Sequence, residues 1–342
     1  MIRYTDLKMT ARQDLMQVLP LSKPFTVLIE PSSLCNFRCV QCFQGMPPSS
    51  AFMRARGTMP MALFREAVRQ LRAWPGPKLK VLKLSLYGEP LVNRDFTDMV
   101  KTARQADVAE RIETTTNAAL LSRTVAERLV EDQLDYMRVS IYASNQSRQE
   151  AVTRSRVTLQ AIRENLQVLR EVKERAGSPR PFVSCKMLDS YGDDNEEFMS
   201  VFRDVADEVY IDKPHSWIKV DGADFIRGYY ADRADEVMTD LRQHSTPRVA
   251  CPMGFTTLAV RSDGAVAPCC VDFIGGTTLG SIADGGLRAT WDSEGRYEFL
   301  KMQLEGRKHE NPSCAQCDVF MSDHYTLDTI DGFPVSRLRP SE

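Results

Sequence analysis

Six short apolar segments alternate with helical patterns between about residues 20 and 215, and this alternation limits the possible fold more than any other feature. The helical patterns place apolar residues three and four positions apart, as at Phe64, Val68 and Leu71. The predicted strands are Phe25–Ile29, Lys80–Leu86, Arg111–Thr116, Met137–Tyr142, Pro181–Met187 and Glu208–Ile211. Strands that alternate with helices form a parallel sheet with helices on its outer face. Six units are too few for a closed eight-stranded barrel, so we expect an α/β fold built as a partial (β/α)6 TIM-like barrel.

The pattern changes after about residue 216. Phe255–Val260 and Ala265–Pro268 predict a hairpin with an Asp-Gly turn, and Leu287–Leu304 predicts a single helix. We therefore expect a small α+β domain after the barrel. The predicted organisation is an N-terminal extension (1–24), the barrel (25–215), a connector (216–250), the small domain (251–320) and a C-terminal tail (321–342).

Nine cysteines fall mainly into two groups, one near each end of the chain. The chain starts without the apolar core of a signal peptide and has no run of about 18 apolar residues, so we expect a cytoplasmic protein without membrane association. Clustered cysteines in a reducing compartment are typical of metal sites rather than disulfides. The net charge of -2 argues against a general nucleic-acid binder.

The first group is Cys35, Cys39 and Cys42, in the pattern C-x3-C-x2-C directly after the first predicted strand. Three soft thiolates on one short loop can hold three irons of a [4Fe–4S] cubane. The fourth iron is then open, and an open metal position can bind a second molecule. This group therefore indicates a cluster that binds and activates a second molecule, and not a purely structural metal site.

The second group follows the pattern C-x12-G-x4-C and then C-x2-C, with Cys251, Cys269, Cys314 and Cys317 as its members. Four thiolates can close a tetrahedral zinc site or hold all corners of a second [4Fe–4S] cluster. Taken alone, this group favours zinc.

The first cysteine group, the βα alternation and the turn Gly88-Glu89-Pro90 together resemble the radical S-adenosylmethionine (SAM) superfamily over the N-terminal two-thirds of the chain. The resemblance implies that the three cysteines ligate three irons and that SAM chelates the fourth. It also implies that one electron from the reduced cluster cleaves SAM to methionine and a 5′-deoxyadenosyl radical, which abstracts hydrogen from a substrate. An electron donor such as flavodoxin or ferredoxin would supply that electron.

The resemblance assigns SAM contacts to residues that follow the second and third predicted strands. Gly88, Glu89 and Pro90 match the motif that holds the SAM amino group, and glycine there permits close backbone approach. Thr116 and Asn117 match the strand end that meets the ribose.

Three further positions complete the implied SAM site. Ser140 and Arg154 match residues that often meet the SAM carboxylate, although a buried structural hydroxyl and a solvated arginine are equally good interpretations. The residue before the third cysteine is usually aromatic in this superfamily. Here it is Gln41, and the aromatic Phe43 follows the cysteine instead, so Phe43 is the candidate for adenine contact.

The second cysteine group resembles the first half of a SPASM domain. Because no cysteine follows Cys317, it resembles the shortened twitch version with one auxiliary [4Fe–4S] cluster. The x4 spacing selects Cys269 as the ligand, which leaves Cys270 as a buried small residue or as a hydrogen-atom donor to a substrate radical, as in epimerases of this superfamily. Cys185 lies within a predicted strand and is expected in the core. A saturated auxiliary cluster can accept the electron left after hydrogen abstraction and deprotonation.

Candidates for acid/base chemistry follow the sixth predicted strand, namely Asp212, Lys213 and His215. Ser184 and Lys186 share one side of the fifth strand and would bind polar substrate groups if that side faces the lumen. The remaining histidines, His244, His309 and His324, are expected at the surface.

The function that these features favour is oxidation of a small polyol, a sugar or aminocyclitol of secondary metabolism, because the layout most resembles the aminocyclitol dehydrogenases. A peptide-modifying maturase is an alternative, although the roughly 24 residues before the first strand leave little room there for a peptide-recognition domain. A redox-neutral epimerase, decarboxylase or dehydratase is a third possibility. A zinc-stapled binding module is the non-enzymatic one.

Overall fold

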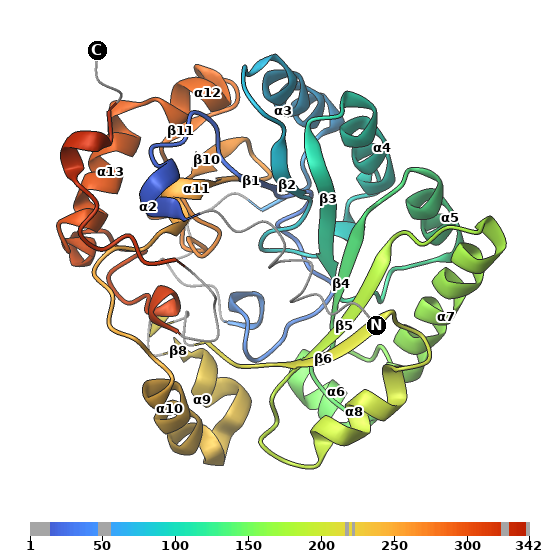
Figure 1. The fold of residues 1–342 in the computed structure, drawn as a ribbon. Coiled ribbons are helices and arrows are strands. Elements are labelled where there is room, and N and C mark those ends of the chain that lie inside the picture. Colours follow the sequence, from blue (N-terminus) through green and yellow to red (C-terminus); the bar gives the residue numbers. More distant parts are fainter. Residues whose placement is uncertain (1–13, 47–55, 216–218, 221–222, 323–327, 340–342) are drawn as a thin grey trace.

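The structure is a computed structural model that describes residues 14–46, 56–215, 219–220, 223–322 and 328–339. Its main sheet curves around the centre of the molecule, and its strand order is β11-β10-β9-β1-β2-β3-β4-β5-β6 (Figure 1). Strands β1 to β6 run parallel to their neighbours. These strands are β1 (Thr26–Ile29), β2 (Leu79–Lys83), β3 (Ala109–Thr116), β4 (Tyr136–Ser140), β5 (Phe182–Leu188) and β6 (Glu208–Asp212). The expected partial (β/α)6 barrel is confirmed.

Helices cover the outer face of the parallel sheet (Figure 1). They are α3 (Met61–Ala73), α4 (Phe96–Ala106), α5 (Arg123–Glu131), α6 (Gln146–Thr153), α7 (Leu159–Ala176) and α8 (Asp194–Phe202). Each long helix turns one apolar stripe toward the sheet, and in α3 the stripe consists of Phe64, Ala67, Val68 and Leu71. Burying a large apolar side chain of this kind contributes about 1.5–3 kcal/mol.

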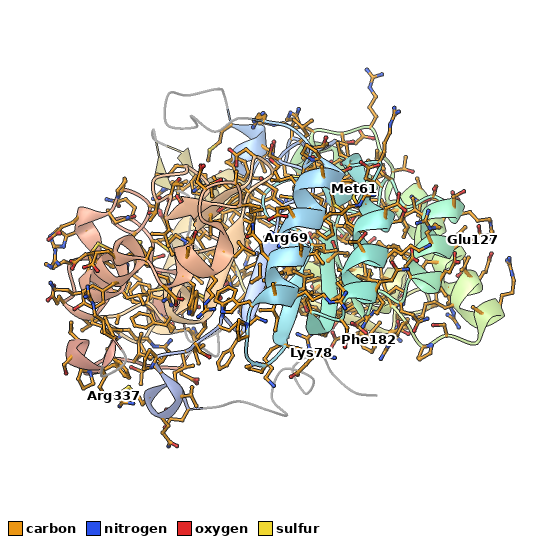
Figure 2. All side chains as sticks on the ribbon, turned by 90° about the horizontal axis from the view of Figure 1, so that it is seen from above. Met61, Arg69, Lys78, Glu127, Phe182 and Arg337 are labelled. Carbon is orange, nitrogen blue, oxygen red and sulfur yellow. The ribbon has the colours of Figure 1, made fainter. Side chains whose placement is uncertain are left out.

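The strands point their carboxyl ends toward one rim of the barrel. In Figure 2, Lys78 just before β2 and Phe182 at the start of β5 lie at one edge, whereas Met61 at the start of α3 lies at the opposite edge. The loops that follow the strands therefore meet at the rim where Met61 lies. Ligand sites of parallel α/β sheets occur at this end of the strands.

The predicted hairpin forms, with β9 (Thr257–Val260), β10 (Ala265–Ala267) and Gly264 at a φ of 88° in the turn. Strand β9 also pairs in parallel with β1, from Thr26 opposite Thr257 to Ile29 opposite Val260. The short β11 (Gly280–Ser281) completes this edge. The small domain thus extends the barrel sheet, which the sequence pattern did not indicate.

Two predicted elements differ from the observed ones. The single helix expected over Leu287–Leu304 is wrong, because the structure has α12 (Gly286–Trp291) and α13 (Glu294–Leu304). Ser293 separates them, since its side chain caps α13 by accepting a hydrogen bond from Arg296 N at 3.1 Å. Strand β2 ends at Lys83 rather than at Leu86.

Two connector helices, α9 (Phe225–Tyr230) and α10 (Ala234–Gln243), close the side of the barrel beyond β6 (Figure 1). Helix α9 lies against the cysteine loop, because a Cβ at Gly228 would lie 2.9 Å from the carbonyl oxygen of Val40. The Tyr229 hydroxyl donates to the carbonyl of Tyr142 at 2.7 Å. Smaller elements are α2 (Leu15–Val18), α11 (Met253–Thr256), β7 (Lys219–Val220) and β8 (Ala223–Asp224). Within the described ranges, none of the helices has the length and apolar character that a bilayer crossing requires.

Candidate functional site

The loop with the first three cysteines leaves the end of β1 and is tied to the end of α6. Arg38 N donates to the carbonyl of Thr153 and Val40 N to that of Val152, each at 2.9 Å. Backbone N–H groups also point at two of the sulfurs. Phe37 N donates to Cys35 Sγ at 3.4 Å, and Gln44 N donates to Cys42 Sγ at 3.5 Å. Such N–H groups stabilise a thiolate and so suit sulfurs that bind metal.

The three cysteines line a cavity of about 350 Å³ at the carboxyl ends of the barrel strands. This volume lies within the range of small-molecule sites. The structure brings most of the predicted site residues to this cavity: Cys35, Cys39, Cys42, Phe43, Gly88, Glu89, Thr116, Asn117, Ser140, Asp212, His215 and Cys270. Pro90, Arg154 and Lys213 are not among its lining residues.

Glu89 is a buried carboxylate with 3% of its surface exposed. Thr116 Oγ1 and Leu91 N donate to its Oε1 at 2.6 and 3.1 Å, and Asn117 N donates to its Oε2 at 2.8 Å. Burial raises the pKa of Glu89 to about 7, although these hydrogen bonds act in the opposite direction. A cationic group placed in the cavity beside Glu89 would therefore hold it in the ionised form.

Gly88 brings the loop after β2 against the cysteine loop. A Cβ there would lie 2.3 Å from the Ser32 carbonyl oxygen and 2.5 Å from that of Leu34, so only glycine fits. The next residue continues the contact, since Glu89 N donates to the Leu34 carbonyl at 2.8 Å. Pro90 is buried and begins a single 3-10 turn, Pro90–Val92, which ends the loop.

Phe43 and Gln41 form one wall of the cavity. The ring of Phe43 stacks on Phe273 with centroids 5.5 Å apart and meets Tyr87 edge-on at 5.8 Å. Gln41 has 3% of its surface exposed, and neither Oε1 nor Nε2 has a hydrogen-bond partner among the described residues. A buried amide without partners is rare in a folded protein and points to a missing ligand.

Charged side chains from the barrel strands line the cavity opposite the cysteines. Lys83 on β2, Arg138 on β4 and Lys186 on β5 face it, and Lys186 Nζ pairs with Asp212 at 2.9 Å. Burial would raise the pKa of Asp212, but Lys186 and other cations lower it to about 2. Burial lowers the pKa of Lys186, and Asp212 opposes this effect.

The sequence carries a clear signal for Arg138, which is the single charge in its strand. The signal for Lys83 is weaker, because the same strand also contains Lys80, which points the other way and pairs with Glu110. Ser184 also faces inward, where its hydroxyl donates to Glu208 at 2.6 Å, but it does not line the cavity. Cys185 is fully buried in the main core, as expected.

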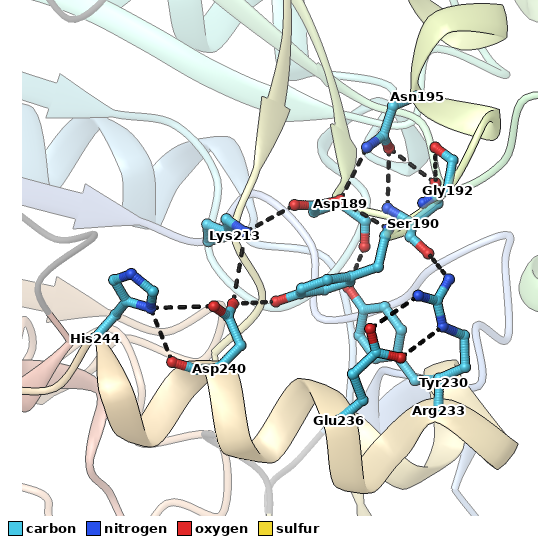
Figure 3. A network of polar contacts seen from close by, with 11 residues as sticks. Asp189, Ser190, Gly192, Asn195, Lys213, Tyr230, Arg233, Glu236, Asp240 and His244 are labelled. Carbon is cyan, nitrogen blue, oxygen red and sulfur yellow. Dashed lines mark hydrogen bonds and ion pairs between the residues drawn. The ribbon is translucent and has the colours of Figure 1, made fainter.

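Lys213, which we expected to be an acid/base candidate at the cavity, does not line it. Its side chain points away from the cavity into a network of polar contacts beside α10, where Nζ pairs with Asp189 at 2.8 Å and with Asp240 at 3.5 Å (Figure 3). The same network holds the Tyr191 hydroxyl, which donates to Asp240 at 2.6 Å. Neighbouring strand residues face opposite sides, so Asp212 and Lys213 separate.

Arg154, for which we expected a contact with SAM, does not line the cavity either. It ends α6 in a left-handed conformation, is exposed, and donates from Nη1 to the Gly45 carbonyl at 2.9 Å. It therefore supports the back of the cysteine loop instead of lining the cavity. Among the other histidines, His244 and His309 are exposed, and His324 lies outside the described residues.

The second cysteine group lines a separate cavity of about 40 Å³. Its members Cys251, Cys269, Cys314 and Cys317 all face it, whereas Cys270 faces the barrel cavity. Consecutive residues thus point into the two cavities. Burial raises the pKa of the Cys314 thiol to about 11, so a bound cation is needed to stabilise the thiolate. Soft sulfur donors around an enclosed, largely apolar space fit an iron–sulfur group.

The four auxiliary sulfurs do not form the tight cluster of ligands that a single metal ion requires. Across the described part of the chain, no three His, Cys, Asp or Glu side chains converge as the ligands of a single metal ion do. The four auxiliary sulfurs line a cavity instead.

Two family models match the chain. The model of the radical SAM superfamily matches residues 29–205, just over half of the 342 residues, and that of an iron–sulfur cluster-binding domain, SPASM, matches residues 251–318. The second match favours a cluster over zinc in the smaller cavity.

Solved structures with a similar fold include three that hold SAM. BtrN in complex with AdoMet and 2-DOIA has a TM-score of 0.54 and 18% identity, over 89% of this chain and 99% of BtrN. SuiB of Streptococcus suis bound to S-adenosylmethionine has a TM-score of 0.61 and 15% identity, over 92% of this chain and 80% of SuiB. Native anSMEcpe with bound AdoMet has a TM-score of 0.58 and 13% identity, over 89% of this chain and 92% of that one. At these identities the likeness concerns the fold.

The family matches agree with the geometry: a partial barrel with a three-cysteine loop at its carboxyl rim, followed by a four-cysteine unit. The chain therefore belongs to the radical SAM superfamily, as an enzyme that uses SAM and [4Fe–4S] clusters and carries a SPASM-type auxiliary-cluster domain.

Proposed function

We propose that this enzyme oxidises an alcohol carbon of a small polyol, a sugar or aminocyclitol, to a ketone. The observation that carries the proposal is the adjacency of the two cysteine-lined cavities: Cys269 lines one, Cys270 lines the other, and Val271 lines both. An electron left on a substrate in the barrel cavity has a short route to the auxiliary cluster.

In this proposal Cys35, Cys39 and Cys42 hold the SAM-binding cluster, and Cys251, Cys269, Cys314 and Cys317 hold the auxiliary cluster. When bound, the first cluster and SAM supply a 5′-deoxyadenosyl radical that removes a hydrogen atom from the substrate. Glu89 would pair with the SAM ammonium, and this cation would hold the buried carboxylate, whose pKa is raised, in its ionised form. Thr116 and Asn117 hydrogen-bond to Glu89 and would meet the ribose, and Ser140, which lines the same cavity, would meet the SAM carboxylate.

Phe43 and the unpaired amide of Gln41 would hold the adenine. A glutamine amide presents one donor and one acceptor, which complement the adjacent acceptor and donor on the edge of adenine. This contact would satisfy both buried atoms of Gln41.

The remaining lining residues suit a substrate with several hydroxyl groups. Lys83, Arg138 and Lys186 donate hydrogen bonds, and Asp212, whose pKa is lowered to about 2, stays ionised and accepts them. After hydrogen-atom removal, the substrate radical still has to lose the hydroxyl proton and one electron to become a ketone. His215 would take that proton, and the cysteines of the second group would hold a cluster able to accept the electron, so that the alcohol loses two electrons and two protons in total.

The substrate class can be tested with deuterated polyols. A polyol deuterated at the reacting carbon should transfer one deuterium to 5′-deoxyadenosine, with one ketone formed per SAM consumed, as measured by mass spectrometry. Replacing Cys35, Cys39 and Cys42 by alanine should abolish 5′-deoxyadenosine formation. Cys185→Ala is the matched control, because it removes a buried core thiol that lines neither cavity. Polyols that never yield labelled 5′-deoxyadenosine, while a peptide does, would favour a maturase; SuiB has also been solved with a precursor peptide.

A redox-neutral epimerase is the second candidate, and Cys270 favours it. This thiol faces the barrel cavity and is not needed to complete the set of four auxiliary ligands. It could return a hydrogen atom to the substrate radical from the opposite side. In D2O an epimerase would incorporate one solvent deuterium at the reacting carbon, and Cys270→Ala would stop that incorporation, whereas a dehydrogenase would give unlabelled ketone.

We place the enzyme in the cytoplasm, with a flavodoxin or ferredoxin as its reductant. The nine cysteines are free thiols, which suits a reducing compartment.

A further inference from the structure

We propose that Gln303 raises the reduction potential of the auxiliary cluster by donating a hydrogen bond to the sulfur of Cys314. This inference rests on the proposed function, because it takes the four cysteines as ligands of that cluster. Gln303 lies on α13, has 1% of its surface exposed and lines the auxiliary cavity. Its Nε2 lies 3.5 Å from Cys314 Sγ, within range for an N–H···S hydrogen bond.

Gln303 differs from the donors to the other auxiliary sulfurs. Val271 N donates to Cys269 Sγ at 3.3 Å, and backbone N–H groups two residues further along the chain likewise face the sulfurs of Cys251 and Cys317. Those donors belong to the backbone, so a substitution removes them only if it introduces proline and changes the backbone itself. The contact from Gln303 comes from a side chain and can be removed while the other three stay.

The orientation of the amide is set by what surrounds it. Its Oε1 is buried and has no hydrogen-bond partner among the described residues. Reversing the amide would place this oxygen against the sulfur, and a thiolate repels a second acceptor. A purely structural side chain of the same length, such as methionine, would fill the space without leaving a buried acceptor unpaired. The contact that this amide makes is therefore the one through its donor.

The direction of the effect follows from charge. Reduction adds one negative charge to the cluster, part of which resides on the thiolate sulfurs, so a hydrogen bond to sulfur stabilises the reduced form more than the oxidised form. Met253, Phe299 and Phe320 line the same cavity, and apolar surroundings strengthen the interaction. We expect the bond to change the ratio of reduced to oxidised cluster about tenfold, which is about 59 mV for one electron.

The test is a redox titration of the auxiliary cluster monitored by electron paramagnetic resonance. The full-length chain with Cys35, Cys39 and Cys42 replaced by alanine is the parent, so that only the auxiliary cluster titrates. Gln303→Met in this parent should keep four irons per chain and lower the potential by about 59 mV. Gln316→Met is the matched control, because Gln316 lies between Cys314 and Cys317 but is exposed. Its potential should equal that of the parent.

The other outcomes show whether the role of Gln303 alone is wrong or whether the assignment of the cluster ligands is wrong as well. A loaded cluster whose potential is unchanged or higher in Gln303→Met overturns the inference alone. A parent without iron overturns the ligand assignment and the inference together. If Gln303→Met does not hold the cluster, Gln303→Asn replaces it, since a side chain shorter by one methylene withdraws the donor, and the same lowering is expected.

Discussion

Gly88→Ala is the substitution whose effect on the active site follows most directly from the structure. The added Cβ would lie 2.3 Å from the Ser32 carbonyl oxygen and 2.5 Å from that of Leu34, both of them backbone atoms. Restoring a distance of 3.4 Å, the start of ordinary contact, requires a displacement of 3.4 − 2.3 = 1.1 Å. The displaced segment is followed immediately by Cys35, so the cluster loop must move with it.

Two magnitudes follow from a displacement of this size. Overpacking of a tightly packed site costs about 1–3 kcal/mol of stability. A shift of about 1 Å in a reacting group lowers a rate by about 100-fold. We therefore expect Gly88→Ala to fold with a modestly reduced melting temperature but to form 5′-deoxyadenosine about 100-fold more slowly.

The assay compares three proteins after anaerobic cluster reconstitution: wild type, Gly88→Ala and Gly57→Ala. Gly57 is the matched control, because it is near in space, donating from its N to Ser33 Oγ at 2.8 Å, yet an added Cβ there meets nothing within 4 Å. Iron per chain, melting temperature and the rate of SAM cleavage are measured for each. If Gly88→Ala cleaves SAM as fast as Gly57→Ala, the close approach does not position the cluster loop and the reasoning is refuted.

Three further predictions concern other residues. Because burial raises the pKa of Glu89 to about 7, the affinity for SAM should increase as the pH rises toward 7 and stay constant above it. Calorimetric titrations should show this trend for the wild type. Glu89→Gln should bind SAM weakly at every pH. Gln41→Met should raise the melting temperature measured without SAM, because leaving a buried amide unpaired costs about 1–3 kcal/mol. The same substitution should weaken SAM binding about tenfold. Equal SAM affinity of the wild type and Gln41→Met would contradict the adenine contact. Lys213→Met should lower the free energy of unfolding by about 1 kcal/mol through its two partly exposed ion pairs while SAM cleavage stays near the wild-type rate; a large loss of cleavage would return Lys213 to the site.

Much of the barrel could be predicted because local patterns determine it. Alternating apolar segments identify β1 to β6, and the outer helices follow from their apolar stripes. The pairing of β9 with β1 joins segments more than two hundred residues apart, and nothing in either segment specifies its partner. The division between α12 and α13 depends on one capping serine, a local signal that the apolar pattern around it obscured.

The site residues could be predicted where the position of a residue in the sequence determines the direction in which its side chain points. Asn117, which directly follows β3, and Glu89, in the loop after β2, reach the cavity because the carboxyl ends of parallel strands share a rim. Lys213 follows a strand too, but strand alternation turns it toward α10. The predicted contact of Arg154 with SAM is not supported for another reason. The end of α6 faces the back of the cysteine loop, so the arginine side chain reaches that loop and not the cavity. Gln303 was missed because a helix of weak amphipathic pattern gives no sign that one glutamine will meet a distant sulfur.

The parallel ladder between Thr26–Ile29 and Thr257–Val260 has a mechanical consequence. A hinge between the barrel and the auxiliary unit at this point would have to break backbone hydrogen bonds along both strands. The continuous sheet therefore opposes a separation of the two halves as a way to admit a substrate. It also ties together the two cysteine-lined cavities, so we expect the distance for electron tunnelling between clusters held in them to change little when a substrate binds.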